Sequence, residues 1–146
     1  CASQLVDAYA RYGQSVVGLR RSPEEQIGNL GTVGGHWLDD GRLLNVTEFA
    51  EKPTVDFARS NLRVPGVPEG EYLTVFGEYI IRPQIFDYLE ERLAGNVRDW
   101  GECQLTPALD RLFREEGLLG LIIDGQSYDL GQPELYLETL RTFCQA

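Results

Sequence analysis

Segments with helical spacing and segments with strand-like spacing alternate along this chain, and the alternation limits the folds it can adopt. A short β-branched run, Ser15–Arg20, follows a helix-like segment that Ser3 begins and Gly13 ends. The best strand pattern covers Tyr72–Ile81, which is rich in aromatic and β-branched residues. Such alternation is typical of a mixed sheet with flanking helices, so the sequence predicts an α/β fold.

A hairpin and several proline-marked helices complete the predicted elements. Asp39-Asp40-Gly41-Arg42 separates two apolar runs, Thr32–Leu38 and Leu43–Phe49, and an Asp-Gly turn in that setting predicts a β-hairpin. Residues 53–71 contain three prolines, which indicates a surface excursion. The remaining predicted elements are a brief helix after Ser22-Pro23, helices beginning at Pro83, Thr106-Pro107 and Pro133, and a buried strand over Leu118–Ile123.

The amino-acid composition limits the kinds of molecule that this chain can be expected to bind. The 146 residues suit one domain, residues 1–146. Acidic residues outnumber basic ones by 23 to 13, and a net charge of −10 disfavours nucleic acid and anionic membranes. The three cysteines have no zinc spacing and no apolar run is long enough to span a membrane, so we expect a cytoplasmic protein. With His36 as the single histidine, a catalytic triad or histidine metal site is disfavoured.

The residues that could carry chemistry each have a plainer interpretation. The glycine-rich run 29–35 lacks the Lys-Ser/Thr pair of a phosphate-binding loop, so it is a structural turn or a place where a ligand approaches the backbone. Asp39 and Asp40 fit a solvated turn better than a metal site. Asp129 directly precedes a predicted helix, where an aspartate either stabilises the helix start or binds a hard cation.

Glu51-Lys52-Pro53 lies where a predicted strand ends, and strand ends in α/β sheets face the ligand crevice. An ammonium group there suits a phosphate, and the adjacent carboxylate can accept hydrogen bonds from hydroxyl groups. Together they would bind a phosphorylated sugar or alcohol. A pair of surface ions remains the competing interpretation.

Four short motifs in one order along the chain are together similar to one enzyme family. They are Glu51-Lys52-Pro53, Gly77-Glu78-Tyr79, Gly101-Glu102-Cys103-Gln104-Leu105-Thr106 and Tyr128-Asp129-Leu130-Gly131. Their order and spacing resemble the bacterial UTP–glucose-1-phosphate uridylyltransferases, also called UDP-glucose pyrophosphorylases, within the sugar-1-phosphate nucleotidyltransferases. The resemblance extends from the first predicted helix to the last, and it implies part of a Rossmann-like nucleotidyltransferase fold.

The resemblance implies a role for individual residues. Glu51 would accept hydrogen bonds from glucose hydroxyls, and Lys52 would hold the sugar phosphate as the catalytic cation. Gly31 would line the sugar pocket with its backbone, although Leu30 replaces the tyrosine usual before it. Val75 and Gly77 would line the same pocket. Asp129 would help to bind Mg²⁺. The segment Gln104-Leu105-Thr106 would orient the following helix, with a substrate contact by the polar Gln104 as the open alternative.

The resemblance covers only the second half of the family's catalytic domain. The G-x-G-T-R-type nucleotide loop and the acidic motif in the middle of that domain are missing. We therefore expect the carboxy-terminal part that binds glucose 1-phosphate, with most UTP contacts elsewhere and no turnover of UTP by the isolated chain. The alternatives are a thymidylyl-, guanylyl- or adenylyltransferase for another hexose phosphate, a non-catalytic sugar-phosphate-binding module, and a surface for homo-oligomers.

Overall fold

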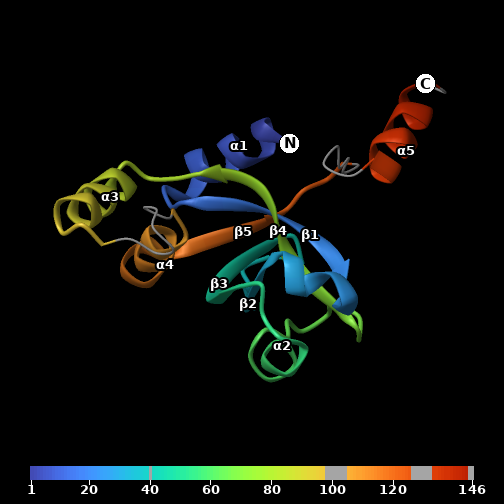
Figure 1. Cartoon of the computed structure of the whole chain (residues 1–146), viewed down its shortest axis with the longest axis horizontal. Coiled ribbons are helices and arrows are strands. Elements are labelled where there is room, and N and C mark those ends of the chain that lie inside the picture. Colours follow the sequence, from blue (N-terminus) through green and yellow to red (C-terminus); the bar gives the residue numbers. More distant parts are fainter. Residues whose placement is uncertain (40, 98–104, 126–132, 145–146) are drawn as a thin grey trace.

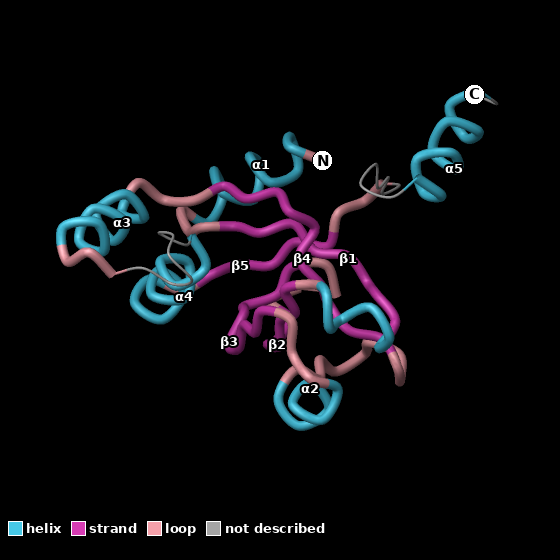
Figure 2. Tube along the Cα trace, viewed as in Figure 1, coloured by secondary structure: helices cyan, strands magenta, loops and turns pink. Residues whose placement is uncertain are grey.

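The computed structural model of the chain describes residues 1–39, 41–97, 105–125 and 133–144. Strands occupy the centre of this structure and helices surround them (Figures 1 and 2). The strands are β1 (Val16–Pro23), β2 (Gly31–Trp37), β3 (Leu43–Glu51), β4 (Glu71–Ile80) and β5 (Leu118–Ile122). The helices are α1 (Ala2–Tyr12), the 3₁₀ helix η1 (Glu24–Asn29), α2 (Val55–Asn61), α3 (Gln84–Ala94), α4 (Leu105–Glu116) and α5 (Pro133–Cys144).

The strands pair in the closed order β1-β4-β2-β3-β5, with β5 returning to β1. The β1–β5 pairing is parallel and the other pairings are antiparallel. The predicted mixed sheet with flanking helices is confirmed. The closed, mainly antiparallel order differs from the open Rossmann-like sheet that the resemblance implied.

Glycines at β-bulges, and where two strands come very close together, explain how a sheet of five strands can close. The register of β2 against β3 shifts between Gly34 and Gly35, and that of β1 against β4 shifts at Gly18. Such bulges increase the twist and bend of the strands. A methyl group at Gly35 would collide with the backbone carbonyl of Asn45, so the strands can approach this closely only because the side chain is absent.

The helices other than α5 pack over apolar clusters, and some of them share one. Leu5 and Ala8 of α1 pack with buried residues of β1, β3 and β5. The cluster under α2 contains Ala58, Leu62 and, from β4, Tyr72. A third cluster joins α3 to α4. The largest cluster lies inside the closed sheet. In Figure 1, α5 stands apart from the sheet, at the end of the chain.

The strands and helices expected from the sequence are confirmed with small shifts at their ends, except within residues 53–71. That segment is not simply a surface excursion, because α2 forms within it. The Thr54 hydroxyl caps this helix by accepting a hydrogen bond from the Phe57 amide at 3.3 Å. Ala58 and Leu62 are buried, so the helix contributes to the core.

A polar cluster links α3 to α4. The Tyr88 hydroxyl donates to Glu115 Oε2 at 2.9 Å and lies 3.2 Å from Glu116 Oε1. Arg111 lies over the Tyr88 ring, 4.2 Å from its centre, and pairs with Glu91 and Glu115. The hydrogen bond to Glu115, with burial, raises the pKa of Tyr88 to about 12.

A membrane span would need a longer apolar helix than any found in the part of the chain that the structure describes.

Candidate active site

Gly31, Glu51 and Val75 meet at one corner of the sheet, where β2 begins and β3 ends. Gly31 and Glu51 are directly opposite each other in the β2–β3 register. A methyl group added at Gly31 would lie 3.2 Å from Glu51 Oε2, 3.3 Å from Phe49 Cζ and 3.4 Å from Val75 Cγ2. The absence of a side chain at Gly31 therefore lets a carboxylate, an aromatic ring and an aliphatic side chain come close together. These three predicted site residues are brought together.

Lys52 follows Glu51 directly and has an unusual backbone. Its φ of 48° is in the left-handed region, which costs a residue with a side chain roughly 1–2 kcal/mol. Its amide donates to the Leu30 carbonyl at 3.2 Å, which ties this turn to the start of β2. The buried Pro53 then leads the chain away from the sheet. Strained backbone of this kind collects at functional sites, where the surroundings hold it in place.

The charges of Glu51 and Lys52 are available to a ligand. Both residues are exposed. Across the described ranges, no salt bridge or side-chain hydrogen bond occupies the Lys52 ammonium group. A carboxylate and an ammonium on consecutive exposed residues, where β3 ends, can bind a molecule that carries hydroxyl groups and an anion.

Gly77 has a different setting. Leu19 is opposite Val75 and Val17 is opposite Tyr79, so Gly77 lies in a bulge of β4 across from Gly18. Its φ of 89° requires glycine, and nothing lies within 4 Å of where its side chain would be. Gly77 borders an open groove of about 460 Å³ beside α1, rather than the space between Gly31 and Glu51. Its first role is to shape the strand.

Tyr79 lies near Glu51, although no role for its side chain was predicted from the sequence. Burial raises the pKa of Tyr79, and the nearby Glu51 carboxylate raises it further. Val75 and Tyr79 face the same side of β4, as their partners Leu19 and Val17 both point into the closed sheet. That shared side was the signal that could have identified Tyr79.

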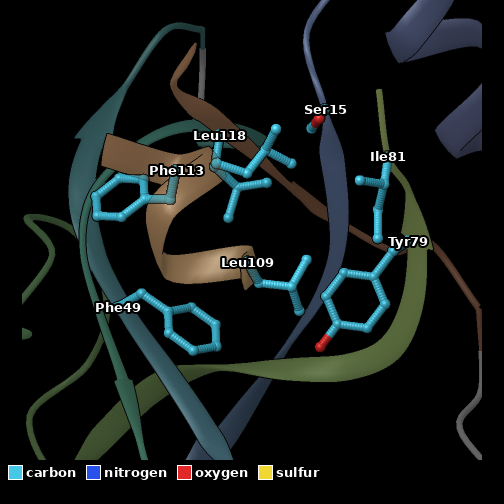
Figure 3. Close-up of a pocket in the computed structure, with 8 residues that line it drawn as sticks. Ser15, Phe49, Tyr79, Ile81, Leu109, Phe113 and Leu118 are labelled. Carbon is cyan, nitrogen blue, oxygen red and sulfur yellow. The ribbon is translucent and has the colours of Figure 1, made fainter. Parts of the chain in front are cut away.

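A cavity of about 10 Å³ lies between the sheet and α4, next to this corner. Figure 3 shows Phe49 and Tyr79 on its walls, with the Tyr79 hydroxyl pointing toward the side that carries Phe49. The space is at the lower limit for one water molecule and its walls are almost entirely apolar, so it is packing space rather than a substrate pocket. The other lining residues are Ser15, Ile81, Leu109, Leu112, Phe113 and Leu118.

The predicted metal ligand cannot be placed. Asp129 and Gln104 lie outside the described residues. Within the described ranges, no group of three or more His, Cys, Asp or Glu side chains could hold a metal ion. Asp39 accepts hydrogen bonds from the amides of Arg42, at 2.9 Å, and Leu43, at 2.7 Å, which agrees with the turn interpretation of this aspartate.

Relatives of known class match most of this chain, although no protein-family model does. UTP–glucose-1-phosphate uridylyltransferase 2 of Staphylococcus saprophyticus is 34% identical over 136 residues, which are 93% of this chain and 42% of the relative. The UTP–glucose-1-phosphate uridylyltransferase of Staphylococcus epidermidis is 32% identical over 136 residues, with the same coverage. The chain thus spans less than half the length of these relatives.

Solved structures agree with the sequence relatives. A crystal structure of apo UDP-glucose pyrophosphorylase is similar with a TM-score of 0.77 at 25% identity, over 97% of this chain and 46% of that one. A UDP-glucose pyrophosphorylase complexed with UDP-glucose gives a TM-score of 0.74 at 26% identity, over 97% of this chain and 48% of that one.

Proposed function

Because the chain belongs to the family of UTP–glucose-1-phosphate uridylyltransferases, we propose that it supplies the sugar-phosphate half of the site that makes UDP-glucose. The observation that carries the proposal is that Gly31, Glu51 and Val75 lie together at one corner of the sheet, with the exposed Lys52 following Glu51 directly. Glu51 would accept hydrogen bonds from glucose hydroxyls, and Lys52 would pair with the phosphate. Val75 would pack against the sugar ring, and Gly77 would keep the strand shaped around it.

The reaction explains why a cation, and no nucleophilic side chain, is needed here. A phosphate oxygen of glucose 1-phosphate forms a bond to the α-phosphorus of UTP. The bond from that phosphorus to the bridging oxygen breaks, and pyrophosphate leaves. Two anions must approach each other, so the Lys52 ammonium lowers their repulsion. Much of the remaining acceleration comes from holding the reactants in line.

Mg²⁺ would add further charge neutralisation between the two anions. Asp129 is the ligand in this chain that the family resemblance implies for it. The described residues contribute no cluster that could bind the ion without further ligands. The remaining ligands, and most nucleotide contacts, would then come from the part of the relatives that this chain does not match.

Calorimetric titration of glucose 1-phosphate into this chain tests the proposal. We expect micromolar binding that weakens at least tenfold in Lys52→Ala and in Glu51→Gln, since each loses a charged partner. Arg11→Ala is the matched control, because it removes one exposed positive charge from α1, which packs elsewhere on the sheet. Absence of binding by the unmodified chain, or equal loss in the control, would contradict the proposal.

A further inference from the structure

The left-handed turn at Lys52 depends on one backbone carbonyl, that of Leu30. This oxygen accepts the Lys52 amide at 3.2 Å and the Thr32 hydroxyl at 3.3 Å. A carbonyl oxygen has two lone pairs, so it can accept both hydrogen bonds at once. The Thr32 hydroxyl therefore acts on the same atom that holds the backbone of Lys52.

Thr32 is fully buried, so its hydroxyl needs a partner. The side chain lies in β2 between Ala50 of β3 and Thr74 of β4. Among the described residues, the Leu30 carbonyl is the acceptor that the Thr32 hydroxyl reaches. This bond ties the carbonyl to a residue that is buried and paired with strands on both sides.

Thr74 provides an internal comparison. It is also fully buried, and it is the direct cross-strand partner of Thr32. Its hydroxyl, however, lies 2.6 Å from Ser22 Oγ and 3.5 Å from the Arg20 carbonyl. Thr74 thus resembles Thr32 in chemistry and burial, but its hydrogen bonds lead away from Leu30.

We infer that Thr32 is a positioning residue for Lys52. By donating to the Leu30 carbonyl, it stabilises the left-handed backbone at Lys52, which lysine adopts only when the surroundings hold it. The position of the ammonium group follows from that backbone. This inference rests on the proposed function, because it is the sugar phosphate that the positioned ammonium would meet.

Hydrogen exchange of the Lys52 amide, followed by NMR, tests the structural step without any ligand. Thr32→Val replaces the hydroxyl with a methyl group, and we expect the Lys52 amide to exchange about tenfold faster. Thr32→Ser keeps the donor and should restore protection. Thr74→Val should leave this amide unchanged. Unchanged exchange in Thr32→Val, or an equal increase in Thr74→Val, would overturn the inference.

A double-mutant cycle with Lys52→Ala tests the functional step. We expect Thr32→Val to weaken binding of glucose 1-phosphate about 3- to 10-fold, and to have no further effect when Lys52 is already alanine. An equal effect in both backgrounds would show that Thr32 acts on the general fold, and would overturn the inference.

Two further outcomes have separate meanings. If the unmodified chain does not bind glucose 1-phosphate, the proposed function fails and the positioning role toward the phosphate fails with it. The amide exchange still decides whether Thr32 holds the turn. If Thr32→Val does not fold, as judged by circular dichroism, Thr32→Ala replaces it in both experiments. If Thr32→Ser folds but neither Thr32→Val nor Thr32→Ala does, the hydroxyl is needed for folding itself. Thr32 would then be a structural residue, and the inference would be overturned.

Discussion

The missing side chain of Gly31 determines what the corner beside Glu51 can hold. Gly31→Ala would place a methyl group 3.2 Å from Glu51 Oε2 and 3.3 Å from Phe49 Cζ, so the carboxylate would have to move. We expect affinity for glucose 1-phosphate to fall about tenfold while the chain stays folded. Calorimetric titration measures the affinity.

Gly28→Ala is the matched control for this change. Gly28 is exposed, and nothing lies within 4 Å of where its side chain would be. The affinity of Gly28→Ala for glucose 1-phosphate should equal that of the unmodified chain. Full affinity in Gly31→Ala would show that the corner does not bind the sugar.

The left-handed backbone of Lys52 makes a second prediction, about stability. Lys52→Gly should be about 1 kcal/mol more stable than Lys52→Ala, because glycine adopts a φ of 48° without the steric cost of a side chain. Urea unfolding of the two variants measures the difference in the free energy of unfolding.

The order of stability of the glycine and alanine variants should reverse in a helix. At Arg11, in the last turn of α1, alanine should be more stable than glycine by about 1 kcal/mol. If alanine were also favoured at position 52, the backbone there would not be left-handed in solution.

At the scale of elements, we expect the contact between α3 and α4 to depend on pH. The hydrogen bond from Tyr88 to Glu115 raises the pKa of Tyr88 to about 12, above the usual value near 10. A raised pKa means that the folded state binds the tyrosine proton more tightly. The stabilisation is therefore complete below about pH 10 and is lost as the pH rises through about 12.

Thermal unfolding by circular dichroism at about pH 8 and about pH 11 tests this prediction. The unmodified chain should lose more stability between the two values than Tyr88→Phe, which has no proton to release at this position. The other tyrosines are common to both proteins and cancel in the comparison. An equal loss in both would contradict the assignment of the shift to Tyr88.

Helix α2 shows why one element was missed. Its 7 residues follow Pro53 and precede two further prolines, and so short a segment has little helical periodicity to read. The helix persists because Ala58 and Leu62 pack beside Tyr72 of β4 and Ile27 of η1. Tertiary packing, rather than local preference, stabilises it.

For the whole molecule, closure of the sheet depends on the close approach of β2 and β3 at Gly35. A methyl group there would collide with the Asn45 carbonyl, which is backbone and cannot rotate away. We expect Gly35→Ala to lower the free energy of unfolding by about 1–3 kcal/mol or more. Urea unfolding measures the loss, and Gly28→Ala should leave stability nearly unchanged. Equal stability of the two variants would show that the strands are further apart.

The activity of the isolated chain is a second prediction at this scale. We expect no UDP-glucose from UTP and glucose 1-phosphate, because the chain spans less than half the length of its relatives and lacks the family's nucleotide loop. Pyrophosphate release, with one of the full-length relatives as a positive control, measures this. Turnover by the isolated chain would show that it binds the nucleotide as well as the sugar phosphate.

The sequence alone predicted the order of most helices and strands and the family resemblance, and it singled out Glu51-Lys52-Pro53 as a candidate site. These properties are encoded locally: periodicity, Asp-Gly turns, helix-starting prolines and short motifs all concern residues a few positions apart. The resemblance implied an open Rossmann-like sheet, whereas the strands close, because strand partners depend on contacts between residues far apart in the chain.

Tertiary structure alone decided which candidate residues lie close together. Gly31, Glu51 and Val75 come from three strands, and register brings them to one corner while leaving Gly77 in a bulge. The left-handed turn at Lys52 and its link through Leu30 to Thr32 were equally invisible in the sequence. A φ angle and a shared hydrogen-bond acceptor depend on where neighbouring strands lie, and that position is settled only when the sheet closes.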